Sequence, residues 1–182
     1  MTTILGISGS LRKASYNTAL LRAAVDLAPD GLRLETAGIH GIPLYDGDVE
    51  AAQGIPEVVV ELKDRVAAAD GLLLVTPEYN NSIPGPFKNA IDWLSRPATD
   101  ITRVFGGKPV ALMGASPGRF GTISAQTAWL PVFRVLGLRP WFDMPLYVSA
   151  VHKAVDEQHR LIDPDTRERL RKFLAGFAAF IA

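Results

Sequence analysis

The stretch GSLRKASYN, residues 9–17, lies between two segments of different character. Before it, residues 4–7 form a short apolar run, ILGI, which is typical of a strand covered on both faces. After it, apolar residues recur at the spacing of one helical stripe, at Ala19, Leu20, Ala23, Ala24 and Leu27. The stretch is therefore predicted to be a polar loop that leads from a buried strand into an amphipathic helix.

A loop in this position favours the binding of an anion. Unpaired backbone N–H groups and the positive end of the helix dipole lie at the N-terminus of the predicted helix. Ser10, Ser15 and Asn17 add short hydrogen-bonding side chains, and Arg12 adds a cation suited to phosphate. We expect a phosphate-binding loop here. The alternative is a plain helix cap, in which Ser15 or Asn17 only satisfies the first turn.

Three common phosphate loops do not fit this stretch. The P-loop pattern fails because Ala14 follows Lys13 and no glycine lies five positions before that lysine. The dinucleotide fingerprint fails because no third glycine opens the helix. A thiolate phosphatase loop needs a cysteine, and the chain contains none.

The same order of strand, polar loop and helix recurs along the chain. Further strands are predicted at residues 32–36, 71–75 and 110–113, with a last one at 139–142 or displaced to 146–148. Helices are predicted at residues 55–69, 82–94, 125–136 and 163–181. Ser82 is expected to cap the second of these helices, and Pro131 to disturb the third. Residues 38–54 show neither period and are predicted to be a long surface loop.

Five alternations of strand and helix predict a single doubly wound α/β domain over residues 1–182. Its expected core is a five-stranded parallel sheet with helices on both faces. Ligands of such sheets bind beyond the carboxyl ends of the strands. Three polar loops share that edge, at residues 9–17, 76–82 and 114–121, and we expect them to form one site.

The composition limits the classes of function. The 19 basic residues balance 19 acidic ones, so nothing indicates a nucleic-acid partner. The absence of cysteine excludes disulfides and thiol catalysis, and the three histidines, which we expect to be exposed, lack metal-ligand spacing. No apolar run approaches membrane-spanning length and no signal segment opens the chain, so we expect a cytoplasmic protein without a membrane or metal partner.

Motifs in the three loops carry a family resemblance. They are GSLR with Ser15 and Asn17, then PEYN at residues 77–80 continuing through PGPFKNAIDW at 84–93, and finally SPG at 116–118 with Gly121. In these motifs the chain resembles the NADPH-dependent FMN reductase and NAD(P)H quinone reductase family, with its chromate-reductase-like members and its flavodoxin-like fold. Phe87 stands where many members carry leucine, and the region after Phe142 matches only loosely.

The resemblance implies an FMN-dependent enzyme that transfers two electrons from NADPH or NADH to a small acceptor. Quinones, flavins, azo dyes, nitroaromatics and chromate are the acceptors of relatives. In this reading the first loop holds the FMN phosphate, the second wraps the isoalloxazine and ribityl chain, and the third closes the pyrimidine side. The implied cofactor-binding residues are Ser10, Leu11, Arg12, Ser15, Asn17, Pro77, Glu78, Tyr79, Asn80, Ser116 and Gly118. The cofactor carries the hydride chemistry, so no catalytic acid or base is expected.

Several side chains have a plainer reading beside this one. Glu78 is more often an oriented carboxylate than a general base, and Tyr79 either stacks near the flavin or covers the core edge. Lys88 and Asp92 have the spacing of a surface ion pair on a helix. Arg119 either receives a 2′-phosphate or is a solvated loop residue, so nicotinamide preference stays open.

Two rival functions share this sheet topology. A flavodoxin-type electron carrier binds FMN without oxidising nicotinamide, but such a protein is usually strongly acidic, and this chain is balanced. A phosphoacceptor signalling domain needs acidic residues after the first strand and an aspartate after the third, which SGS at 8–10 and TPE at 76–78 do not provide.

The helices after Ser82 and Gly121 carry more apolar residues than one stripe needs. Trp93, Trp129 and Phe133 either pack in the core, which is the first interpretation, or face another subunit. Ile123 and Leu130 fall off the predicted stripe. We expect a homodimer or a homotetramer with these two helices at the contact and with the loop at residues 38–54 walling the acceptor pocket.

Overall fold

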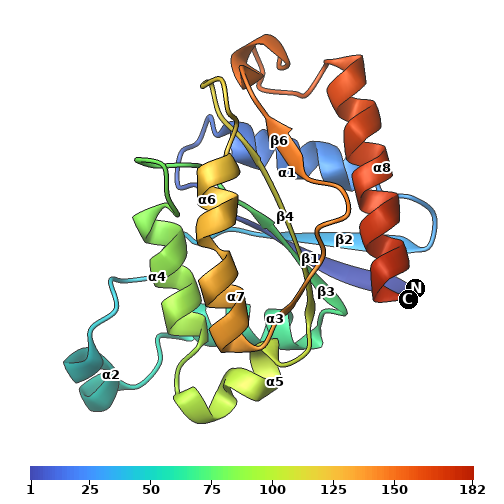
Figure 1. Cartoon of the computed structure of the whole chain (residues 1–182). Coiled ribbons are helices and arrows are strands. Elements are labelled where there is room, and N and C mark those ends of the chain that lie inside the picture. The colour runs from blue at the N-terminus through green and yellow to red at the C-terminus, as the bar shows by residue number, and fades with distance from the viewer.

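A parallel sheet forms the centre of the computed structural model, which describes all residues 1–182 (Figure 1). Its strands are β1 (Thr2–Ser8), β2 (Leu32–Ala37), β3 (Gly71–Val75), β4 (Pro109–Ala115), β5 (Arg139–Pro140) and β6 (Leu146–Val148). The order across the sheet is β2-β1-β3-β4-β5, and every pairing is parallel. This is the flavodoxin-like order, with its switch point between β1 and β3. The predicted fold class is confirmed.

The last position of the sheet is shared by two short strands. β5 pairs with the beginning of β4, and β6 pairs with its end. The prediction of five strands, with the last at one of two places, was therefore wrong in one respect, because both places form a strand. Residues 141–145 separate the two strands. Among them Trp141 is buried, and its N–H still donates to the Val110 carbonyl of β4 at 2.9 Å.

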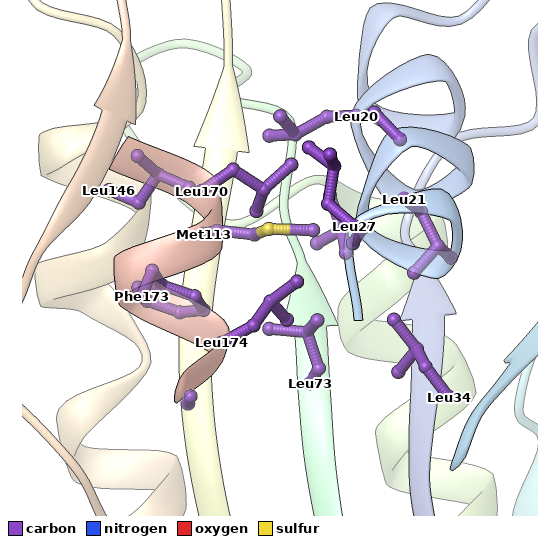
Figure 2. Close-up of a cluster of buried hydrophobic side chains, with 14 of the residues drawn as sticks. Leu20, Leu21, Leu27, Leu34, Leu73, Met113, Leu146, Leu170, Phe173 and Leu174 are labelled. Carbon is purple, nitrogen blue, oxygen red and sulfur yellow. The ribbon is translucent and has the colours of Figure 1, made fainter. Parts of the chain in front are cut away.

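Helices cover both faces of the sheet. One face lies under α1 (Tyr16–Asp26) and α8 (Pro164–Ile181), and Figure 2 shows their leucines meeting those of β2 and β3 around Met113. The other face lies under α3 (Glu57–Ala68), α4 (Gly85–Leu94), α5 (Ile101–Phe105), α6 (Ile123–Ala128) and α7 (Leu130–Leu136). The two cores contain 23 and 21 buried residues, so the sheet is covered almost equally on its two sides. No helix is long and apolar enough to cross a membrane.

Three local features differ from the predictions or refine them. The predicted loop at residues 38–54 contains a helix, α2 (Gly47–Gln53), whose residues are all outside the core, so it leaves no apolar stripe in the sequence. Ser82 does not cap α4, which begins at Gly85 after Pro84. The disturbance expected at Pro131 is confirmed, because α6 and α7 are separated at Trp129. Two short 3₁₀ turns, Ala98–Asp100 and Val151–Lys153, complete the chain.

The large aromatics of α4, α6 and α7 are core residues. Trp93 and Trp129 are fully buried, and Phe133 is nearly so. Each indole also has a hydrogen-bond acceptor, because Trp93 donates to the Pro43 carbonyl at 2.9 Å and Trp129 to Thr76 Oγ1 at 3.2 Å. The core interpretation of these three residues is confirmed, so they cannot form an exposed contact with another subunit.

Asp163 caps α8, as the sequence predicts. Its carboxylate accepts from the Thr166 hydroxyl at 2.6 Å and from the Thr166 backbone N–H at 2.8 Å. These two bonds, led by the one from the hydroxyl, hold the pKa of Asp163 below its usual value. Because α8 shares the cover of one face of the sheet with α1, this cap supports a large part of that core.

We predict that Asp163→Ala lowers the free energy of unfolding by about 0.5–2 kcal/mol at pH 7. Asp163→Asn keeps a capping oxygen, so its free energy of unfolding should fall by only part of this amount. A depressed carboxyl pKa stabilises the fold above about pH 4 and loses that contribution as the pH falls through the folded-state value. Urea unfolding at pH 7 and pH 3 should therefore show the wild type and Asp163→Asn converging in acid. A constant gap between them at both pH values would contradict this role.

Candidate functional site

The loops after β1, β3 and β4 converge on one hollow at the carboxyl edge of the sheet. Its lining comprises Ser10, Arg12, Ser15, Tyr16, Asn17, Pro77, Glu78, Tyr79, Ala115, Ser116 and Pro117. Eight of these residues were predicted for the site from the sequence. Three predicted residues, Leu11, Asn80 and Gly118, lie in the same loops but outside the lining. Tyr16, Ala115 and Pro117 line it and were not predicted, although all three neighbour predicted residues.

The first loop leaves β1 through a glycine that has no room for a side chain. A Cβ on Gly9 would lie 2.1 Å from the ring of Phe87, and the Gly9 N–H extends the sheet by donating to Val75 at 3.0 Å. Phe87 is fully buried beneath the loop. The aromatic ring at this position therefore requires glycine above it, and the loop passes close over the core.

Polar groups in the first loop divide into engaged and free ones. Ser15 caps α1 by accepting from Thr18 N–H at 3.2 Å, and Ser10 Oγ accepts from Arg12 N–H at 3.3 Å. The backbone N–H groups of Tyr16 and Asn17, which open the helix, donate to no other group of the chain. The Arg12 side chain is exposed and forms no hydrogen bond or ion pair. Ser15 is therefore a helix cap, as the alternative interpretation holds. The free N–H groups of Tyr16 and Asn17 can still bind an anion beside it.

Asn17 joins the first loop to the end of β4. Its Nδ2 donates to the Ala115 carbonyl at 2.9 Å, and its Oδ1 accepts from the Ala115 N–H at 2.9 Å. Both groups are buried. The side-chain amide is therefore occupied by the protein, and only the backbone N–H of Asn17 can serve an anion.

The second loop ends in a tight turn. Tyr79 and Ser82 exchange backbone hydrogen bonds of 3.1 and 3.0 Å across Asn80 and Asn81. Both asparagines have positive φ, 50° and 58°, which is the pattern of a type I′ turn and one that asparagine tolerates well. This turn explains why Ser82 does not start α4. It also leaves Tyr79 half exposed at the edge of the hollow.

Glu78 is an oriented carboxylate. Its Oε2 accepts from the Ala125 N–H at 2.9 Å, in the first turn of α6. The positive end of that helix favours a negative charge there. Glu78 therefore holds the start of α6 against the second loop, which agrees with the plainer of its two interpretations.

The third loop is closed by its own serine. Ser116 Oγ donates to the Gly121 carbonyl at 2.7 Å and accepts from the Gly118 N–H at 3.2 Å. Before it, Gly114 lies so close to Thr76 and Thr122 that a Cβ would come within 2.3 Å of the Thr76 carbonyl oxygen. The third loop is thus packed directly against the second.

The remaining predictions for charged and histidine side chains have mixed outcomes. Lys88 and Asp92 form the expected surface ion pair, with nitrogen–oxygen distances of 2.6 and 2.8 Å. His40 and His152 are exposed, as predicted. The prediction for His159 was wrong, because it is half-buried and its ring stacks on Tyr16 with 5.6 Å between centroids. No group of three or more acidic or histidine side chains is arranged to hold a metal ion.

Comparison with known proteins identifies this arrangement. A family model described as NADPH-dependent FMN reductase matches residues 2–156. The chain belongs to this family. An NAD(P)H-dependent FMN reductase from Pseudomonas aeruginosa is 44% identical over 178 residues, which cover 98% of this chain and 94% of that protein. A 2-hydroxy-1,4-benzoquinone reductase from a Burkholderia species is 39% identical over 175 residues, which cover 96% of this chain and 93% of that protein.

A solved structure agrees with this assignment. FerB, described as a flavoenzyme NAD(P)H:(acceptor) oxidoreductase from Paracoccus denitrificans, has a TM-score of 0.87 to this chain at 34% identity, over 100% of this chain and 97% of its own. This FMN reductase family member is therefore an oxidoreductase with FMN as its cofactor and NAD(P)H as its co-substrate. The predicted family, enzyme class and cofactors are confirmed.

The donor set of the hollow fits the anionic end of FMN. Two free N–H groups at a helix N-terminus and an unpaired guanidinium lie in one loop, and the only carboxylate of the lining, Glu78, is engaged with α6. No carboxylate in the lining is therefore left free to repel a phosphate there. The family assignment and the local chemistry point to the same loop.

The Asn17 clamp gives a stability prediction. Asn17→Ala leaves a buried N–H and a buried carbonyl without a partner, so the free energy of unfolding should fall by about 1–3 kcal/mol. Asn89→Ala is the matched control, because Asn89 also makes two backbone bonds, of 2.8 Å each, to Tyr45 and Pro43, but at the surface, where water can replace them. Urea unfolding measures both variants. Equal losses for the two would show that the clamp has no special importance.

Proposed function

We propose that the loop at residues 10–17 holds the phosphate of FMN and that quinones and related small acceptors are reduced in the same hollow. The observation that carries this proposal is the pair of free N–H groups at Tyr16 and Asn17, next to the unpaired guanidinium of Arg12. Backbone N–H groups at a helix start bind phosphate well, and an arginine adds a charge-assisted bond. The quinone-reducing activity is suggested by the names of relatives such as the Burkholderia enzyme.

The individual roles follow from which groups are free. Ser10 and Ser15 are buried beneath the phosphate position, where their hydroxyls can each make a further bond in addition to those within the loop. Asn17 contributes its N–H, while its side chain holds the loop in place. Pro77, Glu78, Tyr79 and Asn80 offer main-chain groups and the Tyr79 ring along the second loop. Leu11, Ser116 and Gly118 form the rim.

Bound FMN supplies the two-electron chemistry between the nicotinamide and the acceptor. The chain's own task is to bind and orient its ligands. The only carboxylate in the lining, Glu78, accepts from the first turn of α6, and the lining contains no histidine, so the proposal assigns no general acid or base to the chain. The one domain of 182 residues carries the whole proposed site, and a cytoplasmic location is part of the proposal.

The binding role of Arg12 gives a direct test. Arg12→Ala removes one charge-assisted hydrogen bond, so FMN affinity should fall roughly 10- to 150-fold. Lys13→Ala removes an exposed cation from the adjacent position and should change the affinity much less. Fluorescence titration of the flavin-free protein measures both. Indistinguishable titrations of the wild type and Arg12→Ala would remove the phosphate assignment.

The proposed reduction of quinones by NADPH or NADH is tested separately. Oxidation of NADPH or NADH by the FMN-loaded protein, followed at 340 nm with 1,4-benzoquinone, should depend on the quinone. Rapid flavin reduction by dithionite with no oxidation of either nicotinamide would instead indicate an electron carrier.

We also propose that the protein works as a homodimer or homotetramer, with a contact at α6 and α7. The tryptophans do not support this, but smaller residues do. Ile123, Leu130 and Val135 are 42%, 40% and 77% exposed along these helices. Leu130 shares the lining of a hollow of about 170 Å³ with Phe142 and Met144, which are also exposed. Several exposed apolar side chains on two successive helices are typical of an association face.

The contact can be tested with paired surface variants. Light scattering at micromolar concentration should give a dimer or tetramer mass for the wild type and a lower mass for Leu130→Glu. Val60→Glu places the same charge at a residue of similar exposure on α3, 42% against 40% for Leu130, and should leave the assembly unchanged. A monomer mass for the wild type with full reductase activity would exclude both the interface and any pocket shared between subunits.

A further inference from the structure

The segment between β6 and α8 supports a residue of the cofactor hollow. In Figure 1 this segment lies at the top, in the orange part of the chain. Val155 and Leu161 pair as an antiparallel bridge, so residues 155–161 form a small hairpin. The family match ends at residue 156, in the first part of this hairpin. Its role therefore has to be argued from its own contacts within the chain.

The hairpin is built around one carboxylate. Asp156 Oδ1 accepts from the N–H groups of Gln158 and Arg160 at 3.0 and 2.8 Å, and its Oδ2 accepts from the Arg160 guanidinium at 2.7 Å. The bonds from Arg160, the backbone one first, hold the pKa of Asp156 below its usual value. At the base of the hairpin, Leu161 is buried and Val155 packs on the core under α1 and α8. The hairpin is thus anchored at its base and fixed internally.

His159 has an unusual backbone at the tip of this hairpin. Its φ is 57°, in the left-handed region that few residues other than glycine adopt, although histidine is among the more tolerant ones. Its N–H donates to the Asp156 carbonyl at 2.9 Å. In this conformation the imidazole stacks on the ring of Tyr16, with 5.6 Å between centroids and 30° between planes.

Tyr16 connects this stack to the hollow. It is the first residue of α1, lies between the buried Ser15 and Asn17, and lines the hollow with them. It is half-buried against the same core that Val155 contacts. One turn later along α1, a separate hollow opens between that helix and the hairpin, lined by Arg22, Asp26 and Arg160 among others. The Tyr16–His159 stack is therefore the contact that closes the gap between α1 and the hairpin on the side of the phosphate loop.

We propose that Tyr16, backed by the ring of His159, is the outer wall of the phosphate end of the FMN site and that the hairpin at residues 155–161 is its positioning element. This inference rests on the proposed phosphate loop. A wall of two stacked rings keeps water from one side of the loop, and charge-assisted hydrogen bonds are stronger where water is excluded. The wall should therefore favour FMN over riboflavin, which lacks the phosphate.

The test uses the full chain, stripped of flavin and titrated with FMN and with riboflavin. His159→Gly removes the ring and allows the same left-handed backbone. It should weaken FMN binding by about 2- to 12-fold, the range expected for one aromatic pair, and change riboflavin binding less than 2-fold. Glu157→Gln, at an exposed neighbouring position whose side chain forms no hydrogen bond or ion pair, is the control and should change neither.

A double-mutant cycle makes the assignment specific. In the Tyr16→Ala background, His159→Gly should have no further effect on FMN affinity, because the ring it supports is already absent. An equal loss in both backgrounds, an unchanged FMN affinity, or an equal loss for riboflavin would each overturn the proposal. If His159→Gly does not fold, His159→Asn, which also tolerates the left-handed backbone and lacks the ring, decides by the same criteria.

The proposal can fail without the phosphate loop failing. If Arg12→Ala weakens FMN binding while the His159 variants do not, only the positioning role is wrong. If the wild-type protein does not bind FMN at all, the proposed function fails as well.

Discussion

The two hydrogen bonds between the Asn17 side chain and the backbone of Ala115 determine where the functional loops can lie. They connect the first turn of α1, the helix that follows β1, to the end of β4, which lies two strands from β1 in the sheet. Around them, Gly9 passes over Phe87 and Gly114 lies against Thr76 with no space for a side chain. A buried amide pairing of this kind is costly to break, because both partners would lose their only hydrogen bonds. The hollow is therefore formed by the folded scaffold itself.

Most polar side chains near the hollow have structural partners, and this makes the free ones informative. Glu78 holds α6, Ser116 closes its own loop, and Ser15 caps α1. The unengaged groups include the backbone N–H groups at the start of α1 and the Arg12 side chain. Free N–H donors at a helix start beside an unpaired cation favour an anion. The chemistry of a bound flavin then needs little more from the chain than position.

The segment from Pro43 through α2 illustrates how an outlying part of the chain is held in place. Tyr45 stacks edge-on against Trp93 at 5.0 Å and donates its hydroxyl to Glu50, which also accepts from Arg96 at 2.8 Å. The Arg96 guanidinium accordingly lowers the pKa of Glu50. Asn89 of α4 holds the same loop through two backbone bonds. Although α2 stands apart from the body of the molecule in Figure 1, its approach to α4 is thus well defined.

The sequence by itself determined the sheet, the helix stripes and the three loops of the site, because each depends on local periodicity and on residues close along the chain. The parallel sheet, the burial of Trp93 and Trp129 and the three loops that supply eight lining residues were predictable on that basis, whereas the flavodoxin-like fold with its 2-1-3-4-5 order was implied only by the family resemblance. The tertiary structure decided the features that join distant segments. Asn17 pairs with a residue 98 positions away, and Tyr16 stacks on His159 from a segment with no recognisable motif. Neither contact leaves a periodic signal in the sequence. That the Asn17 side chain serves the fold, while its backbone N–H is left for a ligand, is therefore seen only in the folded structure, where α1 meets β4.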